Sequence, residues 1–264
     1  MPNGYRYPDT NDEIMTAGIE QWEPFPGYWN ESARRGRDRL DRKLRTLLPS
    51  REAVNGLDAG CGWGRLLPWV AKFAARITAV DPDSHRIAQA KAQASIADTT
   101  VQFEHGSIMD VDGGPYDLIL CSHVVQHVPT TMVPRILKKL AEVSSSDGVL
   151  VLAFSRSPVD EESYGLSYLD DGRARVDTID RARFDEVASR RENPGCVPFR
   201  RIDPDNLAIE ARTAGWRLCW EWTYHIDNQP RSLYGRDQDD IINSSPDLAR
   251  QSGGDIYTLW RPRS

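Results

Sequence analysis

The sequence predicts an α/β fold built around a parallel sheet. Short apolar runs of strand length alternate along the chain with longer segments of helical periodicity, which is the order that gives a parallel sheet covered by helices. The first apolar run, 54–59, leads directly into a glycine-rich turn, as a buried strand does when it turns sharply into a helix. With 264 residues, the chain can bury the core of one elaborated domain.

The glycines of this turn, Gly60, Gly62 and Gly64, each have a predicted physical role. Gly60 can take a positive φ, Gly62 has no side chain to hold a ligand away from the backbone, and Gly64 lets the following helix lie close to the strand. The free N–H groups at the start of such a helix can hold a phosphate or the carboxylate of an amino acid. The turn is therefore a candidate ligand cradle.

The glycine spacing separates two classes of ligand. The dinucleotide fingerprint G-x-G-x-x-G requires glycine at position 65, where this chain has Arg65, so the spacing disfavours NAD. Glycines at 60, 62 and 64 instead resemble motif I of the class I S-adenosylmethionine-dependent methyltransferases. Asp81 stands where that family places the acid that accepts both ribose hydroxyls. The resemblance implies S-adenosyl-L-methionine as the cofactor.

Three further segments follow in the order of the same family. Residues 101–110 resemble its third strand and adenine loop, 115–123 its fourth strand and the loop beneath the methionine part of the cofactor, and 146–152 its fifth strand. The resemblance implies a doubly wound, mostly parallel sheet of seven strands with an antiparallel last strand and helices on both faces. It implies cofactor contacts at Asp58, Gly60, Cys61, Gly62, Asp81, Pro82, Ser107, Ile108, Cys121, Ser122 and His123.

The adenine loop departs from the family pattern. An acid often receives the exocyclic amine there, whereas Ser107 follows Gly106 in this chain. The contact is then expected from the Ser107 hydroxyl, from Asp110 or from water, while Ile108 can offer its backbone N–H and an apolar side chain to the ring.

Composition narrows the partners and the location. No stretch approaches the roughly 18 apolar residues of a membrane helix, and the amino terminus lacks the layout of a secretion signal, so a cytoplasmic protein is expected. Four cysteines without C-x-x-C spacing indicate neither a zinc site nor a disulfide framework. A net charge of −6 disfavours nucleic acid and favours a small-molecule substrate.

Residues 1 to about 32 are rich in proline and aromatics and lack sustained periodicity, which suggests an arm packed over the domain. Tyr28 and Trp29 are candidates to cover the pocket and bind substrate, although aromatics of this kind can equally anchor a loop on the core. Residues 33–48 predict a helix with leucines on one face and arginines on the rest. Pairs of Asp38 with Arg42 and Asp41 with Arg45 would make this a solvated face, and Arg34 could reach the cofactor carboxylate.

The remaining elements follow in order. An alanine-rich helix is expected after Asp83, and another through 133–143 that stops at Gly148. Asp203 and Pro204 open a helix that Gly215 closes. Alternating residues from 216 to 226 predict a strand with one buried face, and 256–260 can supply the final strand.

Two segments exceed what connections need, and long connections in compact domains are usually functional or mobile. Residues 157–201, which contain Tyr164 and Tyr168, are interpreted as a substrate lid, with a homodimer contact or a surface loop as alternatives. Residues 227–254 are the second such segment. The expected organisation is an arm and helix over 1–50 and a methyltransferase domain over 51–264 that carries the inserted lid.

The chemistry mainly requires that a nucleophile be aligned with the activated methyl group and that water be kept away. A base is needed only for an acceptor that loses a proton, as a hydroxyl does. His127 is the candidate base, with a structural role or a lid to the pocket as alternatives. A metal pair with His123 is disfavoured because Val124 replaces the glutamate of H-E-x-x-H.

Residues 121–124 lack the sequence signatures of other methyltransferase chemistries. These signatures are an Asn or Asp followed by two prolines, and a Pro-Cys nucleophile. The expected acceptor is a hydroxyl, amine or activated carbon of a small molecule. An RNA or protein methyltransferase and a non-catalytic binding module remain as alternatives, because fold alone does not fix function.

Overall fold

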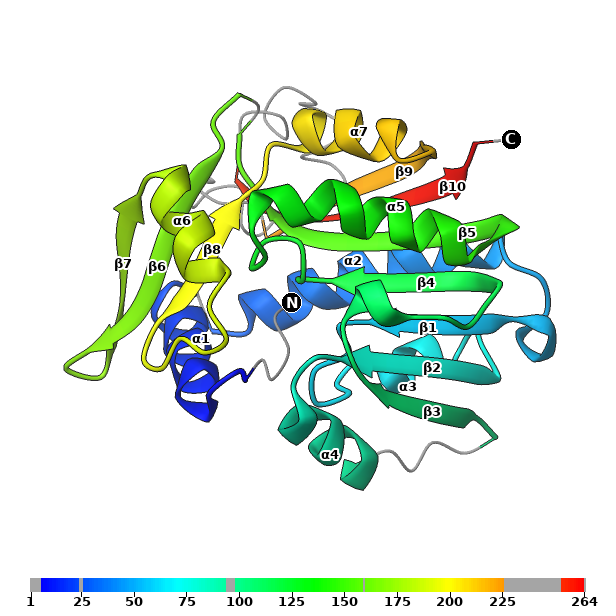
Figure 1. Ribbon diagram of the computed structural model, residues 1–264, viewed down its shortest axis with the longest axis horizontal. Coiled ribbons are helices and arrows are strands. Elements are labelled where there is room, and N and C mark those ends of the chain that lie inside the picture. Colours follow the sequence, from blue (N-terminus) through cyan, green and yellow to red (C-terminus); the bar gives the residue numbers. More distant parts are fainter. Residues whose placement is uncertain (1–5, 24–25, 94–97, 159, 226–252, 264) are drawn as a thin grey trace.

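The computed structural model describes residues 6–23, 26–93, 98–158, 160–225 and 253–263. Its centre is a sheet of seven strands in the order β3-β2-β1-β4-β5-β10-β9 (Figure 1). The strands are β1 (Asn55–Ala59), β2 (Arg76–Asp81), β3 (Thr100–His105), β4 (Tyr116–Ser122), β5 (Ser144–Arg156), β9 (Trp216–Tyr224) and β10 (Gly254–Pro262).

Strand directions match the predicted doubly wound sheet. Neighbouring strands from β3 to β5 are parallel, and β10 runs antiparallel to both β5 and β9. The predicted fold class, including its antiparallel last strand, is therefore confirmed. The strand order reverses between β1 and β4, and ligands of open α/β sheets bind outside the carboxyl ends of the strands at such a point.

Helices cover both faces of this sheet, as predicted. Leu57 of β1 and Ile119 of β4 pack in a core with α5 (Val133–Val143) and α7 (Pro204–Thr213). Their neighbour Leu118 packs on the opposite face with α2 (Tyr28–Arg45), α3 (Leu67–Val70) and α4 (Ser84–Gln93). Side chains alternate between the faces because successive strand residues point to opposite sides.

The predicted arm and lid together form a second, smaller structure, called the cap here and defined as α1 (Asp9–Gln21) with residues 160–201. It contains a three-stranded antiparallel sheet in the order β7-β6-β8, and α1 packs against β6 and β7. Asn11 Nδ2 donates to the carbonyl oxygens of Asn193 (3.4 Å) and Cys196 (3.3 Å). The elements are β6 (Ser163–Asp170), β7 (Arg173–Ile179), α6 (Arg181–Ala188) and β8 (Val197–Arg201).

Hydrogen bonds anchor the cap at the carboxyl ends of the central strands. The Ile202 N–H donates to Ser155 O at 2.9 Å, and the Ser157 N–H donates back to Ile202 O at 3.0 Å. The Arg200 N–H donates to Gln126 O, also at 3.0 Å. The cap consequently stands beside the end of the sheet toward which β1 and β4 point (Figure 1).

Several predicted boundaries were wrong. The arm contains a regular helix, α1. The next helix, α2, begins at Tyr28, after Gly27 with φ +87°, and not at residue 33. The helix α5 ends at Val143 and β5 begins at Ser144, before Gly148. Short 3-10 turns are η1 (Arg51–Ala53), η2 (Ile108–Asp110) and η3 (Thr130–Met132).

Parts of the sequence-based predictions lie outside the described residues. They include Ile226 of the alternating strand and nearly all of the long segment 227–254. Among the helices that are described, none combines the length and the apolar character needed to cross a membrane.

Candidate active site

The glycine turn after β1 has a left-handed backbone conformation, which residues with a Cβ adopt only with steric strain. Gly60, Gly62 and Gly64 have φ values of +86°, +55° and +87°. A Cβ at Gly60 would lie 2.4 Å from Val124 Cγ2, so the turn touches the segment after β4. A Cβ at Gly64 would lie 3.0 Å from Leu67 Cδ1 and 3.2 Å from Ala90 Cβ, so this glycine leaves room for the following helix α3, as predicted, and also for α4.

The helix expected directly after the glycines is much reduced. Only α3, four residues long, follows at Leu67. The N–H groups of Gly60 and Cys61 both donate to Val80 O, at 2.8 and 3.0 Å, which ties the turn to β2. The cradle is therefore formed by the turn itself and not by the end of a long helix.

Asp81 closes the turn from the end of β2. Its Oδ2 accepts the Gly62 N–H and its Oδ1 accepts the Asp83 N–H, each at 2.9 Å. Burial raises the pKa of Asp81, although these backbone donors and Arg86 oppose the shift. Each carboxylate oxygen keeps a second lone pair, so Asp81 can hold the turn and still accept ligand hydroxyls.

Asp58 lies at the floor of the same site. Its side chain is 2% exposed, and no hydrogen bond within the described part of the chain uses its Oδ2. Burial first, and then the neighbouring Asp81, raise the pKa of Asp58 to about 7, while Arg65 opposes this. A buried carboxylate oxygen without a partner is the kind of group that a polar or cationic ligand satisfies.

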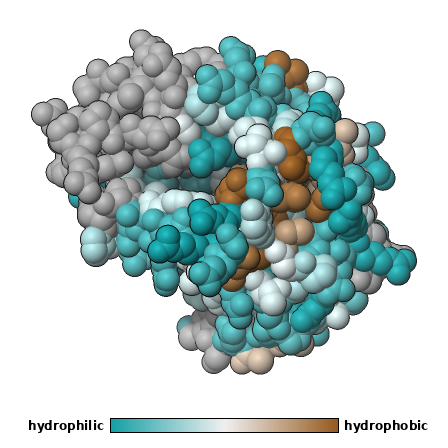
Figure 2. All heavy atoms as spheres, turned by 90° about the vertical axis from the view of Figure 1, so that its left-hand side faces the viewer, coloured by the Kyte–Doolittle hydropathy of each residue, from teal (hydrophilic) through white to brown (hydrophobic). Residues whose placement is uncertain are grey.

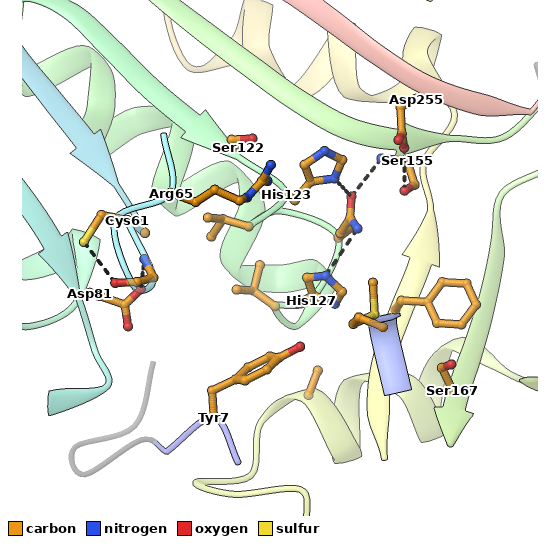
Figure 3. A pocket seen from close by; sticks show the side chains of 18 of the residues that line it. Tyr7, Cys61, Arg65, Asp81, Ser122, His123, His127, Ser155, Ser167 and Asp255 are labelled. Carbon is orange, nitrogen blue, oxygen red and sulfur yellow. Dashed lines mark hydrogen bonds between the residues drawn. The ribbon is translucent and has the colours of Figure 1, made fainter. Parts of the chain in front are cut away.

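A chain of hydrogen bonds follows β4 and faces this cradle (Figure 3). His123 Nδ1 lies 3.2 Å from Gln126 Oε1, which also accepts the Ser155 N–H at 2.7 Å. Gln126 Nε2 lies 3.2 Å from His127 Nε2, and His127 Nδ1 lies 2.8 Å from Pro198 O. The chain thus links the end of β4 to β5 and to the cap.

Both ring nitrogens of His127, the predicted base, take part in these hydrogen bonds. Because Pro198 O can only accept, Nδ1 carries the proton and Nε2 accepts from the Gln126 amide. Burial lowers the pKa of His127 to about 4, so the ring is neutral at pH 7. The geometry therefore favours the structural alternative for this residue.

The start of the arm lies over the cradle. Arg86 on α4 stacks on the Tyr7 ring, 3.9 Å from its centroid, and its Nη2 lies 2.8 Å from Asp12 Oδ1. The Tyr7 N–H donates to Asp83 Oδ2, next to Asp81. Tyr7 therefore lies over the Asp81 side of the cradle, and it had not been among the aromatic residues of the arm predicted to cover the pocket. Its position depends on a contact with α4, which no local pattern in the sequence reveals.

These groups line one large open cleft of about 2250 Å³ that runs from the cradle to the cap. Of the predicted cofactor residues, the structure brings together ten: Asp58, Gly60, Cys61, Gly62, Asp81, Pro82, Ser107, Ile108, Ser122 and His123. Cys121 is not with them, because its side chain is fully buried in the core beside α5. Its place on β4 directs its side chain to the face of the sheet that α5 and α7 cover.

The predicted substrate residues divide in the same way. Trp29 and Tyr164 line the cleft. Tyr28 is not among the described lining residues, because its ring is buried against Trp29 with centroids 4.9 Å apart. Tyr168 is also not among them, and its hydroxyl donates to Asp177 at 3.1 Å on the cap.

The arginines near the site differ from the prediction. Arg34 bonds Glu31 and Asp38 at 2.8 Å on the exposed face of α2, and it does not line the cleft. Arg37, on the face of α2 that carries Trp29, and Arg65 of the glycine turn line it instead. Helical spacing from Trp29 could have identified Arg37, since positions eight apart share a face.

The charge pairs predicted along α2 also differ. Asp38 pairs with Arg34 rather than Arg42. Asp41 accepts the Trp69 Nε1–H at 2.7 Å and lies 3.6 Å from Lys72 Nζ, where Arg45 had been expected. The Asp41 contacts connect α2 to α3 and to Lys72 just after it, whereas the Asp38 pair lies within α2.

Large apolar side chains are exposed on the cap side of the cleft. Ile19 of α1 and Trp22 just after that helix are 54% and 51% exposed, Val176 of β7 is 41% exposed, and all three line the cleft. We call these three residues the apolar wall. Figure 2 shows hydrophobic residues gathered in the middle of this side of the molecule between hydrophilic rims. Exposed apolar patches of this kind mark ligand-binding or interaction surfaces.

Comparison with known proteins agrees with the motifs. A family model described as a methyltransferase domain matches residues 57–148. A ubiquinone biosynthesis O-methyltransferase from Rhodopseudomonas palustris is 28% identical over 121 residues, 44% of this chain and 47% of the relative. An enzyme of the same name from Methylocella silvestris is 33% identical over 173 residues, 64% of this chain and 66% of the relative.

The first of these alignments spans about half the length of the curated relative. The fold extends further. An S-adenosylmethionine-dependent methyltransferase from Clostridium acetobutylicum superposes with a TM-score of 0.58 at 10% identity, covering 96% of this chain and 98% of that one. By its ordered motifs and the matching family model, the stretch 57–148 is a methyltransferase domain, and the strand order gives the chain the fold of S-adenosylmethionine-dependent methyltransferases.

Proposed function

We propose that this protein transfers the methyl group of S-adenosyl-L-methionine to a small-molecule acceptor. The observation that carries the proposal is the continuity of one cleft. The cradle with Asp81 and the unpartnered Asp58 oxygen opens into a chamber bounded by the apolar wall. A polar, charged donor and an apolar acceptor can therefore meet at the carboxyl ends of β1 and β4.

The residues of the cradle fit the chemical groups of this cofactor. Asp81 would accept the ribose hydroxyls, and Ile108 would contact the adenine with Pro82 and Ser107 beside it. Asp58 has the charge to hold the cofactor's ammonium group, and Arg65 and Arg37 have the charge to hold its carboxylate. When bound, the cofactor supplies a methyl group already activated by a sulfonium.

The apolar wall and the net charge of the protein indicate the chemical class of the methyl acceptor. Three exposed apolar side chains favour an acceptor with a substantial apolar body. The net charge of −6 disfavours a polyanion such as RNA. The relatives reported above are named for O-methylation in ubiquinone biosynthesis, which supports a small-molecule acceptor without identifying it.

The cap would act as the lid over this acceptor. Trp29 and Tyr164 would contact it, and Tyr7 would cover the cofactor side. Excluding water favours transfer because the activated methyl group can otherwise meet a hydroxide or water nucleophile. A cytoplasmic location, a homodimer and the exclusion of nucleic acid stay predictions.

The test is a calorimetric titration with S-adenosylhomocysteine, the demethylated product. Wild type is expected to bind one equivalent, and Asp81→Asn to bind about tenfold more weakly or worse, since it loses charge-assisted hydrogen bonds. Asp147→Asn, at an exposed position outside the cleft, is the matched control and should bind as wild type does. Absence of binding to wild type would reject the proposal.

Two further measurements separate the alternatives. A binding module would bind S-adenosylhomocysteine but transfer no labelled methyl group from S-adenosylmethionine to any acceptor of a phenol, amine and thiol panel. An RNA methyltransferase would be retained on a polyanion column at moderate salt.

A further inference from the structure

His123 occupies a strained position at the reversal point of the sheet. It follows β4 directly, its φ is +54°, and its N–H donates to Ala153 O at 2.7 Å. A left-handed backbone is uncommon for a residue with a Cβ, and strain of this kind clusters at ligand sites. Its side chain lines the cleft and lies between the Arg65 side and the Ser155 side (Figure 3).

Backbone groups determine which ring nitrogen of His123 carries the proton. The Ser155 N–H can only donate, so the Gln126 atom that it meets at 2.7 Å is the amide oxygen. His123 Nδ1, 3.2 Å from that same oxygen, must then donate its own proton.

The hydrogen bonds of His127, at the other end of this series, independently give the same orientation of the Gln126 amide. Pro198 O can only accept, so His127 Nδ1 donates and His127 Nε2 must accept from the Gln126 NH₂ group. The Gln126 amide is thereby oriented twice, by β5 and by the cap. Neutral His123 consequently has its lone pair on Nε2, and no hydrogen bond among the described residues uses that atom.

We propose that His123 Nε2 is the proton acceptor of the reaction and that the acceptor group is therefore a hydroxyl. This inference rests on the proposed methyltransferase function and deepens it. A thiolate or a free amine attacks without first losing a proton, whereas a hydroxyl is a poor nucleophile until its proton is removed. His123 Nε2 is thus a basic nitrogen in the cleft that no described residue bonds, which is the feature that a hydroxyl acceptor needs. His225 Nδ1 also lacks a partner in the described part of the chain, but burial lowers the pKa of His225 to about 4, so it is the weaker base.

The acceptor O–H bond breaks and its proton passes to Nε2, while an oxygen electron pair forms the new bond to the methyl carbon. The carbon–sulfur bond breaks and its pair stays on sulfur. The products are the methyl ether, S-adenosylhomocysteine and a protonated His123, which afterwards loses its proton to solvent.

Charged and titratable groups from several elements surround His123. They are His127 on its own segment, His225 after β9, Asp255 on β10 and Arg65 in the glycine turn. Burial lowers the pKa values of His127 and His225 to about 4, so both are neutral between pH 6 and 8.

The first test reads the tautomer without any turnover. In ring-¹⁵N-labelled protein with S-adenosylhomocysteine bound, the His123 signals, assigned by their loss in His123→Gln, should show a protonated Nδ1 and an unprotonated Nε2 at pH 8. Gln126→Met should remove this preference. Protonation at Nε2 in wild type would overturn the proposal.

The second test uses matched acceptors, 2-naphthol and catechol against 2-naphthalenethiol. His123→Gln should lower kcat for the two hydroxyl probes by about 10²- to 10⁴-fold with little change in KM, and lower it less than threefold for the thiol. In His123→Gly, which suits the positive φ, added imidazole should restore part of the hydroxyl activity. His85→Gln, at an exposed histidine outside the cleft, is the control and should behave as wild type.

Each other outcome decides against the inference. Full turnover of hydroxyl probes by His123→Gln, equal losses for hydroxyl and thiol, or no hydroxyl turnover by wild type would overturn it while leaving cofactor binding intact. Failure of wild type to bind S-adenosylhomocysteine would instead reject the proposed function itself.

Discussion

Asp81 Oδ2 accepts the N–H of Gly62 at 2.9 Å, so the acid proposed to bind the ribose also fixes the glycine turn. Its other oxygen accepts the Asp83 N–H, and Asp83 in turn accepts the Tyr7 N–H from the arm. One run of hydrogen bonds therefore connects the cradle, the end of β2 and the arm. A ligand on Asp81 would contact a group that already holds the site together.

Gly60→Ala tests the close contact between the turn and the segment after β4. Alanine at φ +86° costs roughly 1–2 kcal/mol, and its Cβ would in addition meet Val124 at 2.4 Å. Gly172→Ala is the matched control, because Gly172 has φ +72° and open space around it. Denaturant titration should show Gly60→Ala roughly 1 to 3 kcal/mol less stable than Gly172→Ala, with binding of S-adenosylhomocysteine lost. Equal stability of the two variants would contradict the packing described.

Asp58 should release a proton when cofactor binds. Its pKa of about 7 leaves the carboxyl about half protonated at pH 7, and a nearby cation favours the ionised form and lowers that pKa. Binding of S-adenosylmethionine at pH 7 is thus expected to release roughly half a proton and to strengthen as pH rises from 6 to 8. Calorimetry in buffers of different ionisation enthalpy measures this release, which Asp58→Asn should abolish. A release of the same size in that variant would assign the proton to another group.

The apolar wall should affect acceptor affinity and not stability. Ile19→Ser combined with Val176→Ser is expected to raise KM for 2-naphthol by roughly 5- to 30-fold, because each exposed side chain loses its apolar contact with the acceptor. The melting temperature should change little, since both residues are exposed. Ile209→Ser, at an equally exposed residue of α7 outside the cleft, is the control. An unchanged KM in the double variant would place the acceptor elsewhere.

His127 should destabilise the fold at acid pH. Its pKa of about 4 in the folded protein lies below the 6.5 of an unperturbed histidine, so between these values the unfolded chain binds the extra proton. Stability is then lost as pH falls from 6.5 toward 4, by at most about 1.4 kcal/mol per pH unit for this residue. Chemical denaturation across that range should give a shallower pH slope for His127→Gln than for wild type. The exposed control His85→Gln should keep the wild-type slope, and a shared slope for all three would refute neutral burial.

The sheet and cradle were predictable because local sequence determines them. The apolar run before Gly60 and the acid at 81 belong to strands buried on both faces, whose composition is distinctive in any context. The cap was not predictable in this way. Only Ala174 of β7 is buried, and α1 buries Asn11, Ile14 and Gly18, so neither element has a clear apolar periodicity.

Some residues of the candidate site were likewise predictable from local sequence, whereas others depend on tertiary contacts. His123 and Asp58 follow from their places at the ends of β4 and β1. Tyr7 depends on its tertiary contact with Arg86, and Cys121 was placed wrongly because strand alternation directs it into the core. Sequence indicated two histidines after β4, but only the hydrogen bonds of Gln126 distinguish their roles.

A crystal structure with S-adenosylhomocysteine bound tests the central claim most directly. We predict that the nucleoside lies against residues 60–64, with both ribose hydroxyls within hydrogen-bond distance of the Asp81 carboxylate and the sulfur facing the His123 side of the cleft. Density for the ligand at another site, or a cradle filled by the protein's own side chains at saturating ligand, would contradict the account.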